Sequence, residues 1–100
     1  MKVFQVAQYQ IADTFTITGR GLVLAGFILD GVVSVGNYVA FSAFGKVFKR
    51  KIIGVEGLTS SQLSEINIGL LIKCLNEQEV EALSNWTPPN TIATIYQQNN

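Results

Sequence analysis

The chain has 100 residues, which corresponds to one domain over 1–100, and its seven basic and seven acidic residues give a formal net charge of zero. This balance excludes a global basic field that would attract nucleic acid or an anionic membrane. Charged residues make up 14% of the chain and apolar residues 48%, a composition that favours self-association or an obligate protein partner. The alternative is a soluble monomer with a dense core.

The first ten residues contain three glutamines, which makes them too polar for the core of a signal peptide. The longest apolar run, over 22–29, is shorter than the roughly 20 residues that cross a bilayer as a helix. We therefore expect no membrane association, and a lone cysteine fits a reducing, cytoplasmic compartment.

Short runs of β-branched and aromatic residues alternate with Gly, Asn, Asp and Ser, which is the pattern of an all-β protein. Strands are expected at 2–11, 14–18, 21–29, 37–44, 47–55, 67–74 and 91–97. Six to seven short strands predict a small closed antiparallel β-barrel with Greek-key elements.

Glycines mark two changes of direction in the first half of the chain. Gly19 and Gly21 flank Arg20, which indicates a bulge or sharp bend where the sheet curls. Asp30-Gly31 suits a tight turn because glycine accepts positive φ. Between them, 22–29 is apolar on both faces, so one face is expected in the barrel and the other beneath a loop or another chain.

A basic cluster interrupts the middle of the chain. It consists of Lys46, Lys49, Arg50 and Lys51, interleaved with Phe44 and Phe48. On a strand, Lys49 and Lys51 share one face, and Phe48 and Arg50 share the other. Such a strand could contact phosphate or stack a base. We favour the other interpretation, in which lysines protect an edge strand, because four charges on a neutral chain are a weak electrostatic signal.

The polar segment 58–66 is expected to be a loop with at most one helical turn. The segment 76–85 favours a short helix, which we expect near 76–84. Asn76 suits the N-cap, and Glu77 and Glu79 suit the positive end of the helix dipole. On a helix, Glu77 and Glu81 lie on one face and Glu79 points away, which favours a solvated helix face rather than a calcium site. Pro88-Pro89 then predicts an extended crossing into the last strand.

The chemistry available for catalysis is sparse. The chain has no histidine, the usual general base near neutral pH, and one cysteine, Cys74. Lys73 before it could lower the thiol pKa slightly, but nothing supplies a partner base. We therefore expect that the chain is not an enzyme and that it has no catalytic residue, no metal-binding residue and no cofactor.

Four sequence motifs follow one another along the chain in the order and spacing of a known protein family. They are Phe15-Thr16-Ile17-Thr18-Gly19-Arg20-Gly21 with Val23, Gly26 and Gly31; Gly36 with Val39; Ile53-Gly54-Val55-Glu56; and Asn67-Ile68-Gly69-Leu70-Leu71-Ile72-Lys73, followed by the acidic segment 77–81. Over 13–81 they resemble domain 2 of translational GTPases, closest to elongation factor Tu, and more weakly over 82–96. The resemblance implies a closed barrel that helps to bind the 3′ end of aminoacyl-tRNA and touches the ribosomal small subunit. We expect it here as a stand-alone domain without GTP binding of its own.

The resemblance also implies site residues. A pocket for a terminal adenosine would comprise Ile17, Val23, Glu56 and Leu71, with Asn67 beside the aminoacyl group. Candidate phosphate contacts are Arg20, Lys49, Arg50 and Lys51. A structural interpretation stays open, in which the three apolar residues belong to the barrel core and Glu56 caps a turn or pairs with a lysine. The sequence departs from the family at 57–59, at Lys73 and at 85–89.

These observations predict a non-catalytic binding module that contacts a protein partner or a second copy of itself. The alternative is an RNA- or ribosome-associated protein that uses the pocket for the tRNA 3′ end.

Overall fold

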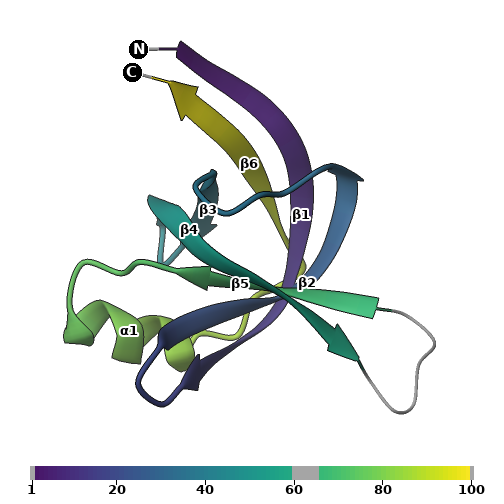
Figure 1. Ribbon diagram of the computed structural model, residues 1–100. Helices are drawn as coiled ribbons and strands as arrows, with labels where there is room; N and C mark the ends of the chain where they lie inside the picture. Colours follow the sequence, from purple (N-terminus) through teal and green to yellow (C-terminus); the bar gives the residue numbers. More distant parts are fainter. Residues whose placement is uncertain (1, 60–65, 100) are drawn as a thin grey trace.

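The computed structural model describes residues 2–59 and 66–99, which form six strands and one helix (Figure 1). The strands are β1 (Lys2–Ile17), β2 (Gly21–Gly31), β3 (Tyr38–Ala43), β4 (Lys46–Thr59), β5 (Ile66–Ile72) and β6 (Thr91–Asn99), and the helix is α1 (Glu77–Ser84). They close into an antiparallel barrel in the order β1-β2-β5-β4-β3-β6. Because β3, β4 and β5 are successive neighbours and β6 returns beside β3, the barrel contains a Greek key. The predicted fold is confirmed.

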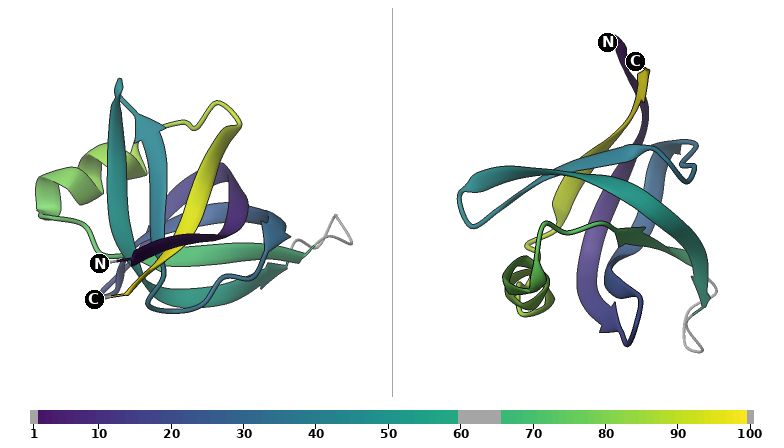
Figure 2. Two further views of the ribbon diagram at one scale, coloured as in Figure 1. Left: turned by 90° about the horizontal axis from the view of Figure 1, so that it is seen from above. Right: turned by 60° about the vertical axis from the view of Figure 1, so that its left-hand side comes forward.

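Helix α1 packs against one end of the barrel, beside β1 and β2 (Figure 2). It begins as predicted, because the Asn76 side chain accepts a hydrogen bond from the Glu79 N–H at 2.9 Å. Leu83 is fully buried and joins the barrel core. The Thr14 hydroxyl donates to the Leu83 carbonyl at 2.7 Å, so a polar contact of β1 fixes the end of the helix over the core.

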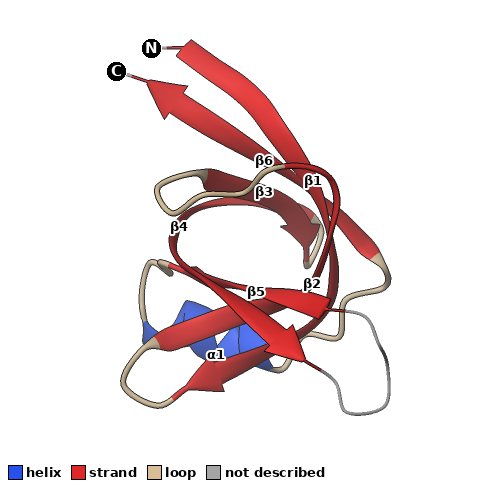
Figure 3. Cartoon of the chain, turned by 45° about the vertical axis from the view of Figure 1, so that its right-hand side comes forward, coloured by secondary structure: helices blue, strands red, loops and turns tan. Residues whose placement is uncertain are grey.

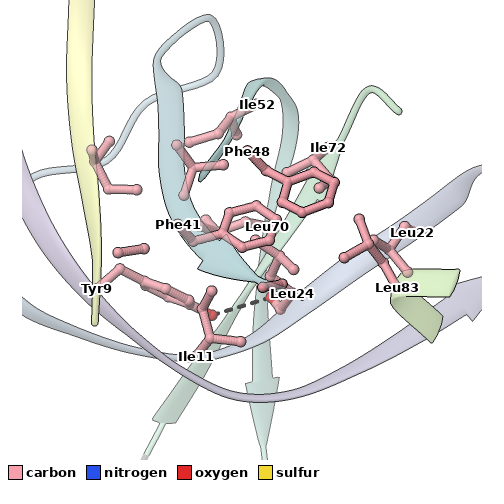
Figure 4. Packing of buried hydrophobic residues seen from close by; sticks show 14 of the residues in the cluster. Tyr9, Ile11, Leu22, Leu24, Phe41, Phe48, Ile52, Leu70, Ile72 and Leu83 are labelled. Carbon is pink, nitrogen blue, oxygen red and sulfur yellow. Dashed lines mark hydrogen bonds between the residues drawn. The ribbon is translucent and has the colours of Figure 1, made fainter. Parts of the chain in front are cut away.

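Figure 3 shows the strands curving around the closed barrel. The barrel core consists of side chains that point inward from alternate strand positions (Figure 4). Its largest fully buried members are Tyr9, Ile11, Leu22, Leu24, Ile52, Leu70, Ile72, Leu83, Ile95 and Val39. The Tyr9 hydroxyl lies within hydrogen-bonding reach of the Leu24 and Ile68 carbonyls. This contact satisfies a phenol that burial would otherwise penalise, and burial holds the pKa of Tyr9 far above its ordinary value.

Strand β1 joins the two strands predicted at 2–11 and 14–18 into one. The register between β1 and β2 shifts between Ile11 and Asp13, so the break in the sequence pattern is a β-bulge and not a loop. Gly26 of β2 lies against this bulge, where a Cβ atom would be 1.8 Å from the Gln10 carbonyl oxygen. The close approach of the two strands therefore requires glycine.

The turn predicted at Asp30-Gly31 is wrong. Both residues lie within β2, where Asp30 pairs with Gln8 and Gly31 with Ala7. Gly31 has φ of +84°, and a Cβ atom there would lie 2.0 Å from the Val6 carbonyl oxygen. The glycine thus serves a close contact with β1 rather than a reversal of the chain.

The sharp bend predicted around Gly19 and Gly21 is the hairpin turn between β1 and β2, closed by the Arg20 N–H donating to the Ile17 carbonyl at 2.9 Å. Strand β4 continues beyond the predicted 47–55, and its pairing reaches Thr59 opposite Ile66. The segment 58–66 was predicted to be a polar loop. Its two ends instead belong to the paired strands β4 and β5. Residues 60–65 lie outside the described part.

Candidate functional site

The outer face of β2, β5 and β4 brings most of the predicted pocket residues together. Val23 pairs with Leu71 across β2 and β5, and Leu71 pairs with Gly54 across β5 and β4. Their sequence neighbours Leu22 and Leu70 belong to the core. Strand alternation therefore turns Val23 and Leu71 to the outside of the barrel, so they are not members of its core.

Val23 and Leu71 are nevertheless only 4% and 7% exposed. Leu71 lies between two glycines: a Cβ atom would lie 3.2 Å from the Leu71 Cβ if added to Gly54, and 3.9 Å from the Leu71 Cδ1 if added to Gly21. The Arg20 guanidinium approaches the same place, since its Nη2 is 3.8 Å from the point that a Cβ atom of Gly54 would occupy. The chain itself thus covers this part of the outer face.

Arg20 and Glu56 form an ion pair at this place. Nη1 of Arg20 lies 2.5 Å from Oε1 of Glu56, and the two side chains are 49% and 39% exposed. Glu56 therefore pairs with an arginine of the β1–β2 turn, where the structural interpretation suggested a lysine. Both charged groups keep accessible atoms beside the buried apolar pair, which leaves them available to a ligand.

Ile17, at the end of β1, pairs with Gly21 and is half-buried. We call Ile17, Val23 and Leu71, together with Arg20 and Glu56, the outer cluster. The main chain of Asn67 pairs with Leu58, but its side chain lies outside the described part of the structure. Four of the five pocket residues are therefore placed together.

The predicted phosphate contacts on β4 divide between two faces. Phe48 lies in the core and Arg50 follows on the same face, whereas Lys49 and Lys51 are exposed. Arg50 makes a two-point contact with Glu79 of α1, in which its Nε donates to Oε2 at 2.8 Å and its Nη2 donates to Oε1. This hydrogen bonding lowers the pKa of Glu79. Arg50 therefore connects α1 to the barrel.

The thiol of Cys74 also lies against Glu79. Burial, followed by a hydrogen bond to Glu79, raises the pKa of Cys74 to about 12. The suggestion of a lowered thiol pKa beside Lys73 is therefore wrong. The cation that acts to lower this pKa is Arg50, and burial and the Glu79 carboxylate outweigh it.

Over residues 2–59 and 66–99, no three His, Cys, Asp or Glu side chains group closely enough to hold a metal ion. In the same part of the chain, no helix has the length and apolarity needed to cross a membrane.

The comparisons with known proteins agree with the fold. No protein-family model matches the chain. Elongation factor Tu from the apicoplast of Theileria parva is 33% identical over 75 residues, covering 71% of this chain and 18% of that protein. The chain thus spans about a fifth of the length of this relative.

Proposed function

We propose that this chain, a closed β-barrel that is similar to domain 2 of elongation factor Tu, is a non-catalytic binding module that recognises the end of an RNA strand at its outer cluster. One observation carries the proposal: the Arg20–Glu56 ion pair lies beside Val23 and Leu71 on one outer face. The sequence resemblance implies a nucleotide pocket at these residues.

The chemistry of the outer cluster suits a terminal nucleoside. A guanidinium contacts phosphate or stacks on a base, and in this proposal Arg20 takes that role. A carboxylate such as Glu56 accepts hydrogen bonds from ribose hydroxyls, including the 2′-OH that distinguishes RNA from DNA. The half-buried Ile17 offers apolar surface to the ring, whereas Val23 and Leu71 are covered by the chain and would become accessible only if Arg20 moves. Binding would require Arg20 to move or to lie against the incoming base.

A non-catalytic role agrees with the same residues. The outer cluster pairs a carboxylate with an arginine, which remains protonated and does not serve as a general acid. Burial raises the pKa of Cys74 to about 12, which keeps the thiol from acting as a nucleophile near neutral pH.

The test is fluorescence anisotropy at low salt with short single-stranded RNA that ends in CCA, compared with the DNA of the same sequence. Glu56→Gln removes the carboxylate charge, and the control Asp30→Asn removes a carboxylate charge from an exposed position at the end of β2 that lies away from Arg20. We expect Glu56→Gln to weaken RNA binding about tenfold, as for a lost hydrogen bond to a charged group. Equal affinities of the two variants, or no RNA binding at low salt, would contradict the proposal.

A second candidate function, self-association, has its own observation. The sequence indicated an interface on the apolar strand β2. The chain covers this strand at Val23, but Leu29, at the other end of β2, is 44% exposed. Val32 and Val35, in the following loop, are 71% and 63% exposed and line one hollow with Val6. Light scattering after size-exclusion chromatography tests this candidate: the wild type should dimerise and Val32→Ser should be monomeric. A monomeric wild type at high concentration would eliminate it.

A further inference from the structure

A second outer face of the barrel lies on β1, β6, β3 and β4, away from the outer cluster. Cross-strand pairing places Gln5, Tyr96, Tyr38 and Lys51 in one row across the four strands. The next row contains Gln8, Thr94, Ala40 and Lys49. We call these eight residues the tyrosine–lysine face. Their sequence neighbours Val39 and Ile95 belong to the core, so alternation turns both rows outward.

The two tyrosines form the centre of this face. The ring centroids of Tyr38 and Tyr96 are 5.7 Å apart, and the rings are inclined by only 17°. Tyr96 is 9% exposed, whereas Tyr38 is half-buried. The barrel strands therefore hold the two rings in a stack. Tyr38, the more accessible ring, lies next to Lys51.

A hollow of about 490 Å³ lies beside Tyr96. Its lining consists of Val3, Gln5, Lys49, Thr94, Tyr96 and Gln98. Two side-chain amides and one ammonium thus surround a space beside an aromatic ring. Amides offer both donors and acceptors to the edge of a base, and an ammonium offers donors to phosphate.

The charge on this face has one sign. In the segments of β1, β3, β4 and β6 that form it, over 2–11, 38–43, 46–51 and 91–99, the chain has no Asp or Glu. The described acidic residues lie elsewhere, at Asp13, Asp30 and Glu56 and on α1. The described ion pairs are Arg20–Glu56 and Arg50–Glu79, so neither Lys49 nor Lys51 has its charge neutralised by a described side chain.

We propose that the tyrosine–lysine face binds single-stranded nucleic acid. An unpaired base extends the Tyr38–Tyr96 stack or enters the hollow beside Tyr96, and Lys49 and Lys51 contact the phosphates on either side. Proteins that bind single strands combine aromatic stacking with basic side chains on an exposed sheet surface in this way. An acidic peptide would match the lysines but would leave the tyrosine stack unused.

This surface is separate from the outer cluster, so the inference does not depend on the proposed function. Lys49 and Lys51 lie on the part of β4 that pairs with β3, whereas Glu56 lies on the part that pairs with β5. Variants on one part of the strand therefore test one surface without removing the charged groups of the other.

The first experiment measures the affinity of the protein for labelled single-stranded oligouridylate and oligothymidylate across a salt series. Each phosphate contact on a single strand contributes about 0.7 to the slope of log affinity against log salt. We expect the double variant Lys49→Gln/Lys51→Gln to reduce that slope by about 1.4, the contribution of two such contacts. Lys46→Gln is the matched control, since Lys46 lies on the same strand over the Phe48 ring, and it should leave the slope unchanged. An unchanged slope in the double variant would overturn the proposal.

The second experiment tests stacking. Tyr38→Leu keeps an apolar side chain at this half-buried position and should weaken binding about tenfold, because a base–aromatic stack is lost. Oligonucleotide added to the wild type should also shift backbone amide NMR signals at 38–40 and 94–96. Shifts confined to the surroundings of Arg20 and Glu56 would overturn the proposal. The proposal would also be overturned if a duplex or polyglutamate bound as tightly as the single-stranded oligonucleotide, because the face would then be a general site for polyanions.

Discussion

Arg20 and Glu56 form an ion pair on the outside of the barrel, although one lies in the β1–β2 turn and the other well along β4. The Arg20 guanidinium lies near Gly54, close to the side chain of Leu71. The ion pair therefore covers an apolar spot that strand alternation turns outward. Because this spot lies on the surface, we expect the pair to contribute little to folding stability.

The first prediction concerns the stability contributed by this pair. Both side chains are well exposed, 49% and 39%, so water screens their attraction. A double-mutant cycle with Arg20→Gln and Glu56→Gln, measured by urea unfolding, should give a coupling energy below about 1 kcal/mol. A coupling several times larger would show that the pair is a structural element, and the outer cluster would lose its support as a binding site.

The second prediction concerns Arg50 and Glu79, whose side chains are only 14% and 11% exposed. Glu79→Gln leaves a largely buried guanidinium without its charged partner and should lower the free energy of unfolding by about 3 kcal/mol. Glu77→Gln is the control, because Glu77 is exposed in the first turn of the same helix. Chemical denaturation of the two variants should separate them clearly, and equal losses would contradict the role of the pair in docking α1.

The third prediction is the pH dependence of that contribution. Hydrogen bonding from Arg50 lowers the pKa of Glu79 below its ordinary value. The carboxylate therefore stabilises the fold fully above the pKa of the unfolded chain, and this stability is lost as the pH falls through the lower, folded pKa. The difference in stability between wild type and Glu79→Gln should be constant near neutral pH and shrink in acid. A difference that grows on acidification would reverse the assigned sign.

The fourth prediction distinguishes backbone strain from steric crowding when a glycine is replaced by alanine. Gly31 and Gly36 both have positive φ, but a Cβ atom at Gly31 would lie 2.0 Å from the Val6 carbonyl oxygen and one at Gly36 would meet nothing within 4 Å. Gly36→Ala should cost about 1 kcal/mol for backbone strain alone. Gly31→Ala should cost at least about 2 kcal/mol more, because β1 and β2 must separate. Thermal unfolding of both variants measures the difference, and equal costs would refute the close approach of the strands.

The barrel was predictable because its strands have a clear local pattern. The N-cap at Asn76 and the opposite faces of Lys49 and Phe48 follow from short-range rules, and the structure confirms both. Asp30-Gly31 misled the prediction because a glycine with positive φ suits a hairpin and also suits a strand crowded by its neighbour. Only the position of Val6 distinguishes the two cases, and that position depends on the closure of the barrel.

The geometry of the outer cluster could not be predicted from the sequence. The resemblance selected Ile17, Val23, Glu56 and Leu71, yet no local pattern pairs Glu56 with Arg20. The stack of Tyr38 on Tyr96 is a further case, since β3 and β6 are far apart in the sequence and meet only when β6 returns to close the barrel. Long-range strand order, which periodicity does not encode, determines both contacts.

The last prediction concerns the reactivity of Cys74. Its pKa is about 12, so the thiolate fraction near pH 8 is about three orders of magnitude below that of a free cysteine. Iodoacetamide should therefore alkylate the folded protein far more slowly than the unfolded chain, as mass spectrometry would show. Because Glu79 helps to raise this pKa, Glu79→Gln should accelerate the reaction, provided that the variant is assayed where it is still folded. Fast alkylation of the native wild type would show instead that the thiol is exposed and that the contact between α1 and the barrel is open at this point.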